Sequence, residues 1–366
     1  MKKIKLLSWA FIAFTLLATS CSKDDSEPVP QLMKDFTAVI VNQGNWSERN
    51  GSISLYNENS NEVRNLAFSQ ANSNRPLSAL VQSFVRNREV GLVICNNPSK
   101  IEVVSTENFE ALRAPLEGTN VENPRYGVVI GSYAYITCWG SSTAVIGQYP
   151  GTTYDIYSYD QSYLIKVDLN TLEIVKTIPC GSDAEGIVAS NNRLFVANTK
   201  GVRVINIATE QEEAYIQHAS LGSFAKQLAV DTNGKVWYSV AGAGLGVIDP
   251  LNLTLESEIA MPNIEGSIAT SLYKDKLYII LSTTENYLPV KAEIVAVDVN
   301  TKMASLTPLY SGKQLVGIKA SPRSGYIYTA EIWNYSTNST MKVINEAGNV
   351  VQEQVMGVAT SEFAFF

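Results

Sequence analysis

One structural unit recurs along this chain, and it is clearest in the stretch from Tyr163 to Ile216. Apolar runs of five to seven residues alternate there with short polar breaks such as Leu-Asn-Thr and Thr-Lys-Gly. Alternation with period two, β-branched and aromatic residues, and polar turns predict antiparallel strands joined by hairpins. Within a unit we expect a short inner strand, then a strand b of the type RLFVAN, a strand c of the type VRVINI, and a strand d.

The same order of strands returns seven times between residue 36 and the C-terminus. Strand b is expected in the segments AVIVNQG, GLVICNN, AYITCWG, RLFVANT, KVWYSVA, KLYIILS and YIYTAEI. Strand c is expected in SISLYN, IEVVST, LIKVDL, VRVINI, LGVIDP, IVAVDV and MKVINE. Four strands per copy, repeated every roughly 40 to 60 residues, are typical of propeller blades. The sequence therefore predicts an all-β fold, a seven-bladed β-propeller with four-stranded blades, over residues 36–366.

The two ends of this region complement each other. The first copy begins directly at strand b, from Phe36 to Val41, and so lacks an inner strand. The chain ends in an apolar run, Ser361–Phe366, that has no partner left after the seventh blade. As the inner strand of blade one, this run would close the ring and remove an open sheet edge, which otherwise templates aggregation. We therefore predict that the C-terminal strand closes the ring.

Residues 1–20 have the layout of a secretion signal, with three early lysines and an apolar run from Leu6 to Ala18 that is shorter than a membrane span. The segment Leu17–Cys21, Leu-Ala-Thr-Ser-Cys, resembles a lipobox, at which bacterial lipoproteins are cleaved and acylated on the cysteine. The alternative is an ordinary signal peptide with an incidental cysteine. Residues 21–35 are polar and punctuated by proline, as in a tether. The acidic cluster after Cys21 resembles the surface-export signal of Bacteroidetes lipoproteins, which implies an outer-membrane protein, lipid-anchored and exposed on the cell surface.

Composition argues against several functional classes. The formal charge is −7 and there is no basic stripe, which disfavours nucleic acid or an anionic membrane surface as partner. The only histidine, His218, is expected on a strand d at the outer rim, so neither a histidine metal cluster nor a Ser-His-Asp set can form on the channel. We therefore expect that this protein is not an enzyme and that it has no catalytic residues, no metal site and no required cofactor. A carboxylate pair for glycoside cleavage stays open, because seven blades can bring distant acids together.

The cysteines that follow Cys21 do not form a recognisable site. Cys95, Cys138 and Cys180 lack Cys-x-x-Cys spacing, and they fall on predicted strands. We interpret them as buried small apolar residues.

The longest connections between the predicted strands are b–c loops, which share one propeller face with the d–a connections. Aromatic residues there suit a platform for a large ligand with an apolar body and a polar fringe. The predicted platform is Trp46, Trp139, Tyr157, Tyr287, Trp333 and Tyr335, and the predicted polar contacts are Asn45, Asn97, Arg125, Glu185 and Lys226. The alternative is that the tryptophans fasten long loops to the blades, and that Arg125 and Glu185 form an ion pair that holds neighbouring blades in register.

Several short motifs match a known family. They are Val41–Trp46 (Val-Asn-Gln-Gly-Asn-Trp), Val81–Ser83, Asn96–Val103, Pro124–Tyr126 followed by Ala134–Thr137, Gly181 with Glu185–Gly186, and the closing run Gly357–Phe365. In these motifs the chain resembles the YncE-like surface-lipoprotein propellers of Bacteroidetes, and within them the BtuG group, which captures cobalamin beside an outer-membrane BtuB transporter. The resemblance covers nearly all of residues 36–366.

The resemblance implies a cell-surface lipoprotein that captures a corrinoid, a ligand of the vitamin B12 type, on the loop-rich face. It also implies a TonB-dependent, BtuB-like outer-membrane transporter as the partner that receives the ligand. Three alternatives stay open: a glycan- or peptide-binding propeller of an outer-membrane uptake complex, a propeller hydrolase or lyase, and a structural partner subunit of a transporter that binds no small molecule.

Overall fold

The computed structural model describes residues 36–366, except 150–151, 223, 272–273 and 287. The predicted signal peptide, tether and lipidation site Cys21 lie outside the described residues. Among the described residues, no helix has the length and apolar character needed to cross a membrane.

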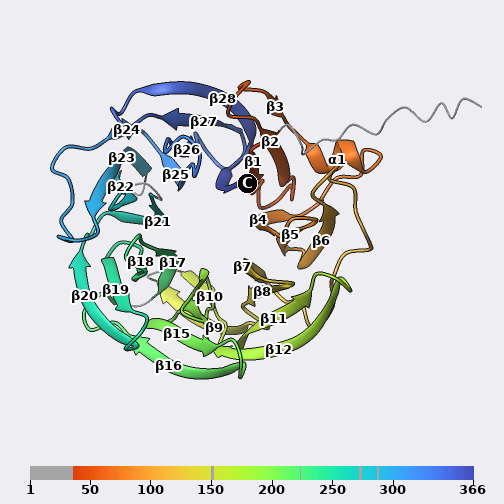
Figure 1. Cartoon of the computed structure of the whole chain (residues 1–366), viewed down its shortest axis with the longest axis horizontal. Helices are drawn as coiled ribbons and strands as arrows, with labels where there is room; N and C mark the ends of the chain where they lie inside the picture. Colours follow the sequence, from red (N-terminus) through yellow and green to blue (C-terminus); the bar gives the residue numbers. More distant parts are fainter. Residues whose placement is uncertain (1–35, 150–151, 223, 272–273, 287) are drawn as a thin grey trace, which may run out of the picture. The chain divides into compact units, whose positions relative to one another are not determined.

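Seven antiparallel sheets stand in chain order around a ring (Figure 1), as predicted. The inner strands, from blade 1 to blade 7, are β29 (Thr360–Phe365), β4 (Leu80–Arg86), β7 (Pro124–Ile130), β13 (Ile187–Ser190), β17 (Ala225–Val230), β21 (Ile264–Thr270) and β25 (Leu315–Ala320). The b strands are β1 (Ala38–Asn42), β5 (Val90–Asn97), β8 (Tyr133–Cys138), β14 (Arg193–Asn198), β18 (Val236–Val240), β22 (Lys276–Glu285) and β26 (Ile327–Glu331). The c strands are β2 (Ser52–Tyr56), β6 (Lys100–Ser105), β11 (Ser162–Asp168), β15 (Gly201–Asn206), β19 (Gly244–Asp249), β23 (Leu288–Asp298) and β27 (Asn338–Ile344).

The outer strands are more variable. They are β3 (Val63–Arg64), β12 (Glu173–Gly181), β16 (Gln211–Gln217), β20 (Thr254–Ala260), β24 (Tyr310–Gly312) and β28 (Val350–Val358). In blade 2 the fourth position is taken by an irregular segment that bonds to β6 through the isolated bridges Ile101–Leu116 and Val104–Ala111. A short helix, α1 (Ala67–Ala71), follows β3.

The core lies between neighbouring blades, where the faces of the b and c strands pack together. Trp237 of β18 shows the principle: its ring is fully buried between blades 5 and 6, and its Nε1 donates to Asp231 Oδ2 at 2.7 Å. All three cysteines of this region are buried and unpaired, and burial raises the pKa of each thiol.

The C-terminal strand closes the ring as predicted. β29 pairs antiparallel with β1, from Ala38 opposite Phe365 to Asn42 opposite Thr360. Phe363 is buried in the core between blades 7 and 1. Arg86 of blade 2 stacks on Phe366, with its guanidinium carbon 3.9 Å from the ring centroid. The last residues therefore join blade 1 to both of its neighbours.

Two connections differ from the long loops that the sequence predicted. In blade 3 the insertion forms an extra hairpin, β9 (Thr143–Tyr149) and β10 (Thr152–Ser158). In blade 6, β22 and β23 continue pairing out to Glu285 and Leu288, beyond the blade itself. Both insertions are rich in Thr, Val, Ile and Tyr, whose stiff or aromatic side chains favour extended pairing over an irregular loop.

Candidate ligand-binding site

The strand register sets which connections share a face. Thr360, the first residue of β29, pairs with Asn42, the last residue of β1, and Pro124 of β7 likewise pairs with Cys138 of β8. Each inner strand therefore starts beside the end of its strand b. We call this side, with the b–c and d–a connections, the loop face, and the opposite side, with the c–d turns, the turn face.

A central cavity of about 470 Å³ opens among the inner strands. Its polar lining residues are Gln43, Gln82, Arg125, Tyr126, Lys226, Gln227, Glu265, Ser267, Lys319, Tyr335, Ser361 and Glu362. Three of the predicted site residues, Arg125, Lys226 and Tyr335, are among them. Because most of the lining comes from the first halves of inner strands, the cavity belongs to the loop face.

A β-bulge near the start of the inner strand recurs in six of the seven blades. A bulge leaves residues unpaired in the ladder and re-aims their side chains. Gln82, Arg125, Lys226 and Glu265 all lie at these bulges, which explains how they reach the cavity. In β25 the bulge residue is Gly317, where a Cβ would lie only 2.3 Å from the carbonyl oxygen of Ser361, so the close approach of β25 to β29 requires glycine.

On one side of the cavity the polar side chains satisfy each other; we call this group the closed network. Arg125 donates from Nε and Nη2 to the two carboxylate oxygens of Glu185, at 3.0 and 3.1 Å, and from Nη1 to Gln82 Oε1 at 2.8 Å. Gln82 in turn donates to the hydroxyl of Tyr126 at 2.7 Å. Burial opposes the charge on Arg125, but Glu185 more than compensates and raises the guanidinium pKa. The closed network spans blades 2, 3 and 4, so the ion pair expected as an alternative to ligand contact is present.

Trp139 belongs to this network and not to an exposed platform. Its ring is half-buried, packs against Tyr159 with ring centroids 4.6 Å apart, and lies 4.0 Å from the guanidinium carbon of Arg125. A cation held over an indole face is attracted by the ring quadrupole. Trp139 thus fastens the base of the blade 3 insertion onto Arg125.

The other side of the cavity keeps its polar groups open. Within the described part of the chain, the side chains of Gln43, Gln227 and Lys319 and the hydroxyl of Tyr335 form no hydrogen bond or ion pair. Lys226 is half-exposed, with Nζ 3.4 Å from Glu185 Oε1. Glu265 accepts one bond, from the backbone N–H of Ser267 at 2.8 Å.

Glu362 also lies on this open side. It accepts a hydrogen bond from the backbone N–H of Phe84 at 3.3 Å. Burial raises the pKa of Glu362 to about 7, while the charge of Lys319 and the bond from Phe84 act in the opposite direction. We call Lys226, Glu265, Lys319 and Glu362 the open arc.

Exposed aromatic side chains gather on the loop face, and one of them, Tyr335, also lines the cavity. Among the described residues, five large aromatic side chains are strongly exposed: Trp46, Tyr157, Phe224, Trp333 and Tyr335. Four of them lie in or at b–c connections, and Phe224 is bridged to Thr199 beside the b–c turn of blade 4, so all five are on the loop face. The most exposed are Trp333, at 72%, and Trp46, at 66%.

Blades 1 and 7 join at this aromatic rim. Asn45 donates from Nδ2 to the carbonyl oxygen of Tyr335 and to Ser336 Oγ, both at 2.9 Å. Lys313 Nζ lies 4.3 Å from the ring centroid of Trp333. Asn45 therefore holds two aromatic loops together. Asn97 ends β5 opposite Leu80 and is not part of the cavity lining, and Tyr287 lies outside the described residues.

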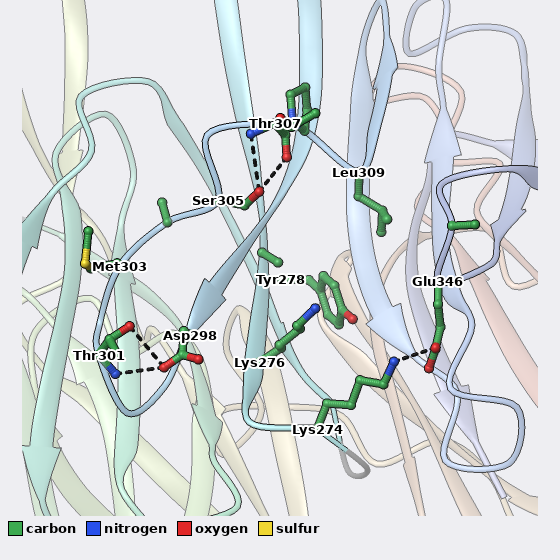
Figure 2. A pocket seen from close by; sticks show the side chains of 14 residues that line it. Lys274, Lys276, Tyr278, Asp298, Thr301, Met303, Ser305, Thr307, Leu309 and Glu346 are labelled. Carbon is green, nitrogen blue, oxygen red and sulfur yellow. Dashed lines mark hydrogen bonds and ion pairs between the residues drawn. The ribbon is translucent and has the colours of Figure 1, made fainter.

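A second hollow, on the outer edge between blades 6 and 7, has a different character (Figure 2). It encloses about 370 Å³, and Lys274 and Glu346 in its lining form an ion pair with each other. Burial raises the pKa of Tyr278 at its wall, with a further contribution from Glu346. None of the predicted site residues lies in this hollow.

The sequence interpretation missed Gln43, Glu265, Lys319 and Glu362 as lining residues of the central cavity. The signal that could have found them is positional, because three of the four lie on inner strands. Among the described residues, no group of three or more His, Cys, Asp or Glu side chains is arranged to hold a metal ion.

No protein-family model and no curated protein sequence matches this chain. Among solved structures, it is similar to a quinonprotein alcohol dehydrogenase-like protein from Bacteroides thetaiotaomicron, with a TM-score of 0.60 and 11% identity over 90% of this chain and 78% of that one. It is also similar to the dihydro-heme d1 dehydrogenase NirN in complex with DHE, with a TM-score of 0.55 and 13% identity over 90% and 75% of the two chains. Apo AztD from Citrobacter koseri gives a TM-score of 0.53 and 10% identity over 90% and 97%. At these identities the similarity shows the propeller fold, which hosts many functions.

Proposed function

We propose that this protein is a binding protein that holds a corrinoid, a ligand of the vitamin B12 type, on the loop face of its propeller. The observation that supports this most is that the exposed aromatic side chains and the polar central cavity share one face of the propeller, with Tyr335 belonging to both. All five strongly exposed aromatics of the described residues lie on that face. Exposed aromatic surface of this kind, rimming polar groups, marks binding sites.

The chemistry of a corrinoid suits this arrangement. A corrinoid is a broad ring edged with amide side chains. The ring would lie against Trp46, Trp333 and Tyr335, while amide arms reach the cavity. The cavity of about 470 Å³ is in the range of small-ligand pockets and can take the arms rather than the whole ring. Because the closed network fixes the wall of the cavity in advance, little ordering cost is expected on binding. This mode requires no cobalt ligand from the protein.

We also propose that the protein is anchored in the outer membrane through a lipid on Cys21, exposed at the cell surface, and that it passes its ligand to a TonB-dependent transporter. The lipobox-like segment Leu17–Cys21 supports the anchor. Lipid labelling of the expressed protein should be lost in Cys21→Ala, and retained labelling would contradict the anchor.

The test is a calorimetric titration of the purified protein with cyanocobalamin, followed in parallel by the visible absorption of the corrinoid. We expect saturable one-to-one binding and a shift of the visible bands. Absence of both heat and a band shift would contradict corrinoid capture. The aromatic rim would then favour the glycan- or peptide-binding alternative, which the same titration with oligosaccharides and peptides would test.

A further inference from the structure

The charged residues that lie at the central cavity, on or just before the inner strands of six blades, alternate in sign around the channel. From blade 3 to blade 1 the residues in ring order are Arg125, Glu185, Lys226, Glu265, Lys319 and Glu362. All but Glu185 line the central cavity, and Glu185 lies directly behind it, bonded to Arg125. The seventh position, in blade 2, is the uncharged Gln82. Signs cannot alternate strictly around a ring with an odd number of positions. A charge at position 82 would have the same sign as one of its two neighbours, Arg125 or Glu362.

These charges act on each other as neighbours. The inner strands of adjacent blades contact one another around the ring. Arg125 and Lys226 both approach Glu185, at 3.0 and 3.4 Å. On the other side of the ring, the charge of Lys319 favours the ionised form of Glu362. Charges of opposite sign therefore interact at two places in the ring, and Glu265 lies between these places in ring order.

Only part of this ring is open to a ligand. The closed network already satisfies Arg125 and Glu185. The open arc faces the cavity with two ammonium groups and two carboxyl groups, in the order Lys226, Glu265, Lys319, Glu362. Its formal charge is zero when both carboxyl groups are ionised.

An alternating arc discriminates between kinds of polar group. A carboxylate placed beside Lys226 or Lys319 also lies beside Glu265, so attraction to one neighbour is offset by repulsion from the next. An ammonium group placed beside Glu265 or Glu362 also lies beside Lys319, so its attraction to the carboxylate is offset by repulsion from the lysine. A primary carboxamide avoids both, because its oxygen accepts from a lysine while its NH₂ group donates to the adjacent carboxylate.

The backbone beneath the ring is fixed from neighbouring blades. Thr137 of blade 3 donates to the carbonyl oxygen of Glu185 in blade 4 at 2.8 Å, and Ser239 of blade 5 donates to that of Gly266 in blade 6. The alternating groups therefore stand on a rigid base, and a rigid base is what geometric discrimination requires.

From this arrangement we infer that the open arc of the channel binds uncharged carboxamide groups in preference to carboxylates and amines. The inference rests on the proposed function, because it takes the loop face to be the binding face. It names the ligand chemistry that the cavity selects: a molecule with several primary amide arms and without free acid groups at the arms that enter the channel.

The experiment uses three probes with one short skeleton, namely malonamide, malonate and propanediamine. Each is titrated at the same ionic strength near pH 8 into isotopically labelled protein, and nitrogen–proton correlation spectra are recorded. We expect malonamide to shift the signals of Gly266, Gly317 and Ser361 and to bind at least about tenfold more tightly than either charged probe. Equal or tighter binding of malonate by the wild-type protein would overturn the inference.

A charge reversal sharpens the test. Glu265→Lys puts a third cation between Lys226 and Lys319, and it should invert the preference so that malonate binds more tightly than malonamide. If the charge reversal impairs folding, Glu265→Gln takes its place. This variant removes the repulsion with little change in shape and should reduce the preference for malonamide. Glu173→Lys, at an exposed position on the outer strand β12, is the matched control and should leave the preference unchanged. An unchanged preference in both Glu265 variants would contradict the inference.

Cyanocobalamin and its monocarboxylate derivatives, in which one amide is replaced by an acid, separate this inference from the proposed function. Tight binding of cyanocobalamin with no penalty for any of the acids would support corrinoid capture and overturn the amide preference. Selective binding of malonamide without binding of cyanocobalamin would support the amide preference and overturn corrinoid capture.

Discussion

Every blade closes its turn-face hairpin with the same device, whereas the b–c connections of the loop face range from two residues in blades 2 and 4 to the extra β9–β10 hairpin in blade 3. On the turn face, a side-chain oxygen at the end of strand c accepts a hydrogen bond from the backbone N–H two residues ahead. The residues that do so are Asn57, Ser105, Asp168, Asn206, Asp249, Asp298 and Asn345. Such local bonds mimic a backbone turn and need no partner from another blade.

The loop face is organised across blades. Its bonds join residues far apart in the chain, such as Arg125 to Glu185 and Asn45 to Tyr335. It also carries all five strongly exposed aromatics of the described residues, while exposed side chains of the turn face, such as Leu251, are aliphatic. The repeated face builds the blades, and we propose that the varied face binds the ligand, as is common for loops positioned by a rigid scaffold.

The largest expected effect is on folding, when the strand that closes the ring is removed. Deleting Glu362–Phe366 removes most of β29 and leaves the inner edge of β1 unpaired. We expect loss of soluble protein, measured as the soluble fraction after expression. A soluble deletion variant with a cooperative, unchanged melt would show that the closure contributes nothing.

The next effect breaks the closed network of the loop face. In Arg125→Met, the carboxylate of Glu185, which is 3% exposed, loses its fork of hydrogen bonds. Leaving one member of a buried ion pair unpaired costs about 3–5 kcal/mol, so we expect a large fall in the free energy of unfolding by denaturant. The matched control is Arg193→Met, since Arg193 forms the same two-pronged contact with Glu213 at the exposed outer rim. A similar loss in both variants would contradict the special role of the network.

A smaller effect depends on pH. The carboxyl group of Glu362 faces Lys319 from β25, the N–H of Phe84 from β4 and the Tyr126 ring from β7. Because burial raises its pKa to about 7 from an ordinary value near 4.5, the native state is destabilised progressively as pH rises from about 4.5 through 7. Glu362→Gln should therefore raise the free energy of unfolding by about 1–3 kcal/mol near pH 8 and change it little near pH 4. Equal effects at both pH values would show that folding does not raise the pKa of Glu362.

The smallest effect concerns the turn face. Asn345 Oδ1 accepts from the N–H groups of Ala347 and Asn349, both at 3.0 Å. Asn345→Ala should cost about 1 kcal/mol, a shift of a few degrees in Tm, and leave ligand binding unchanged. Asn345→Asp keeps the acceptor and should restore most of the loss. Weaker ligand binding in Asn345→Ala would contradict the proposal that only the loop face binds the ligand.

Features with a local or periodic cause could be predicted from the sequence. Alternation located strands b and c of the seven blades, and a count of strands assigned Ser361–Phe366 to blade 1. The extra pairing in blades 3 and 6 was missed, because polar residues interrupt the period-two pattern there.

The candidate site depends on longer-range geometry. Glu265 and Lys319 belong to different blades, and only the curvature of the ring and the bulges bring them to one cavity. The half-buried position of Trp139 depends on Arg125 and Tyr159, whose contacts with it no single segment reveals.

The most direct test of the account compares the two faces in one experiment. Cyanocobalamin is titrated calorimetrically into the wild-type protein, into Trp46→Ala/Trp333→Ala on the loop face, and into Leu251→Ala/Met303→Ala on the turn face, all with similarly exposed side chains. We expect the loop-face pair to weaken binding by about a hundredfold with Tm nearly unchanged, and the turn-face pair to bind like the wild type. Equal binding by all three proteins would contradict the assignment of the ligand to the loop face.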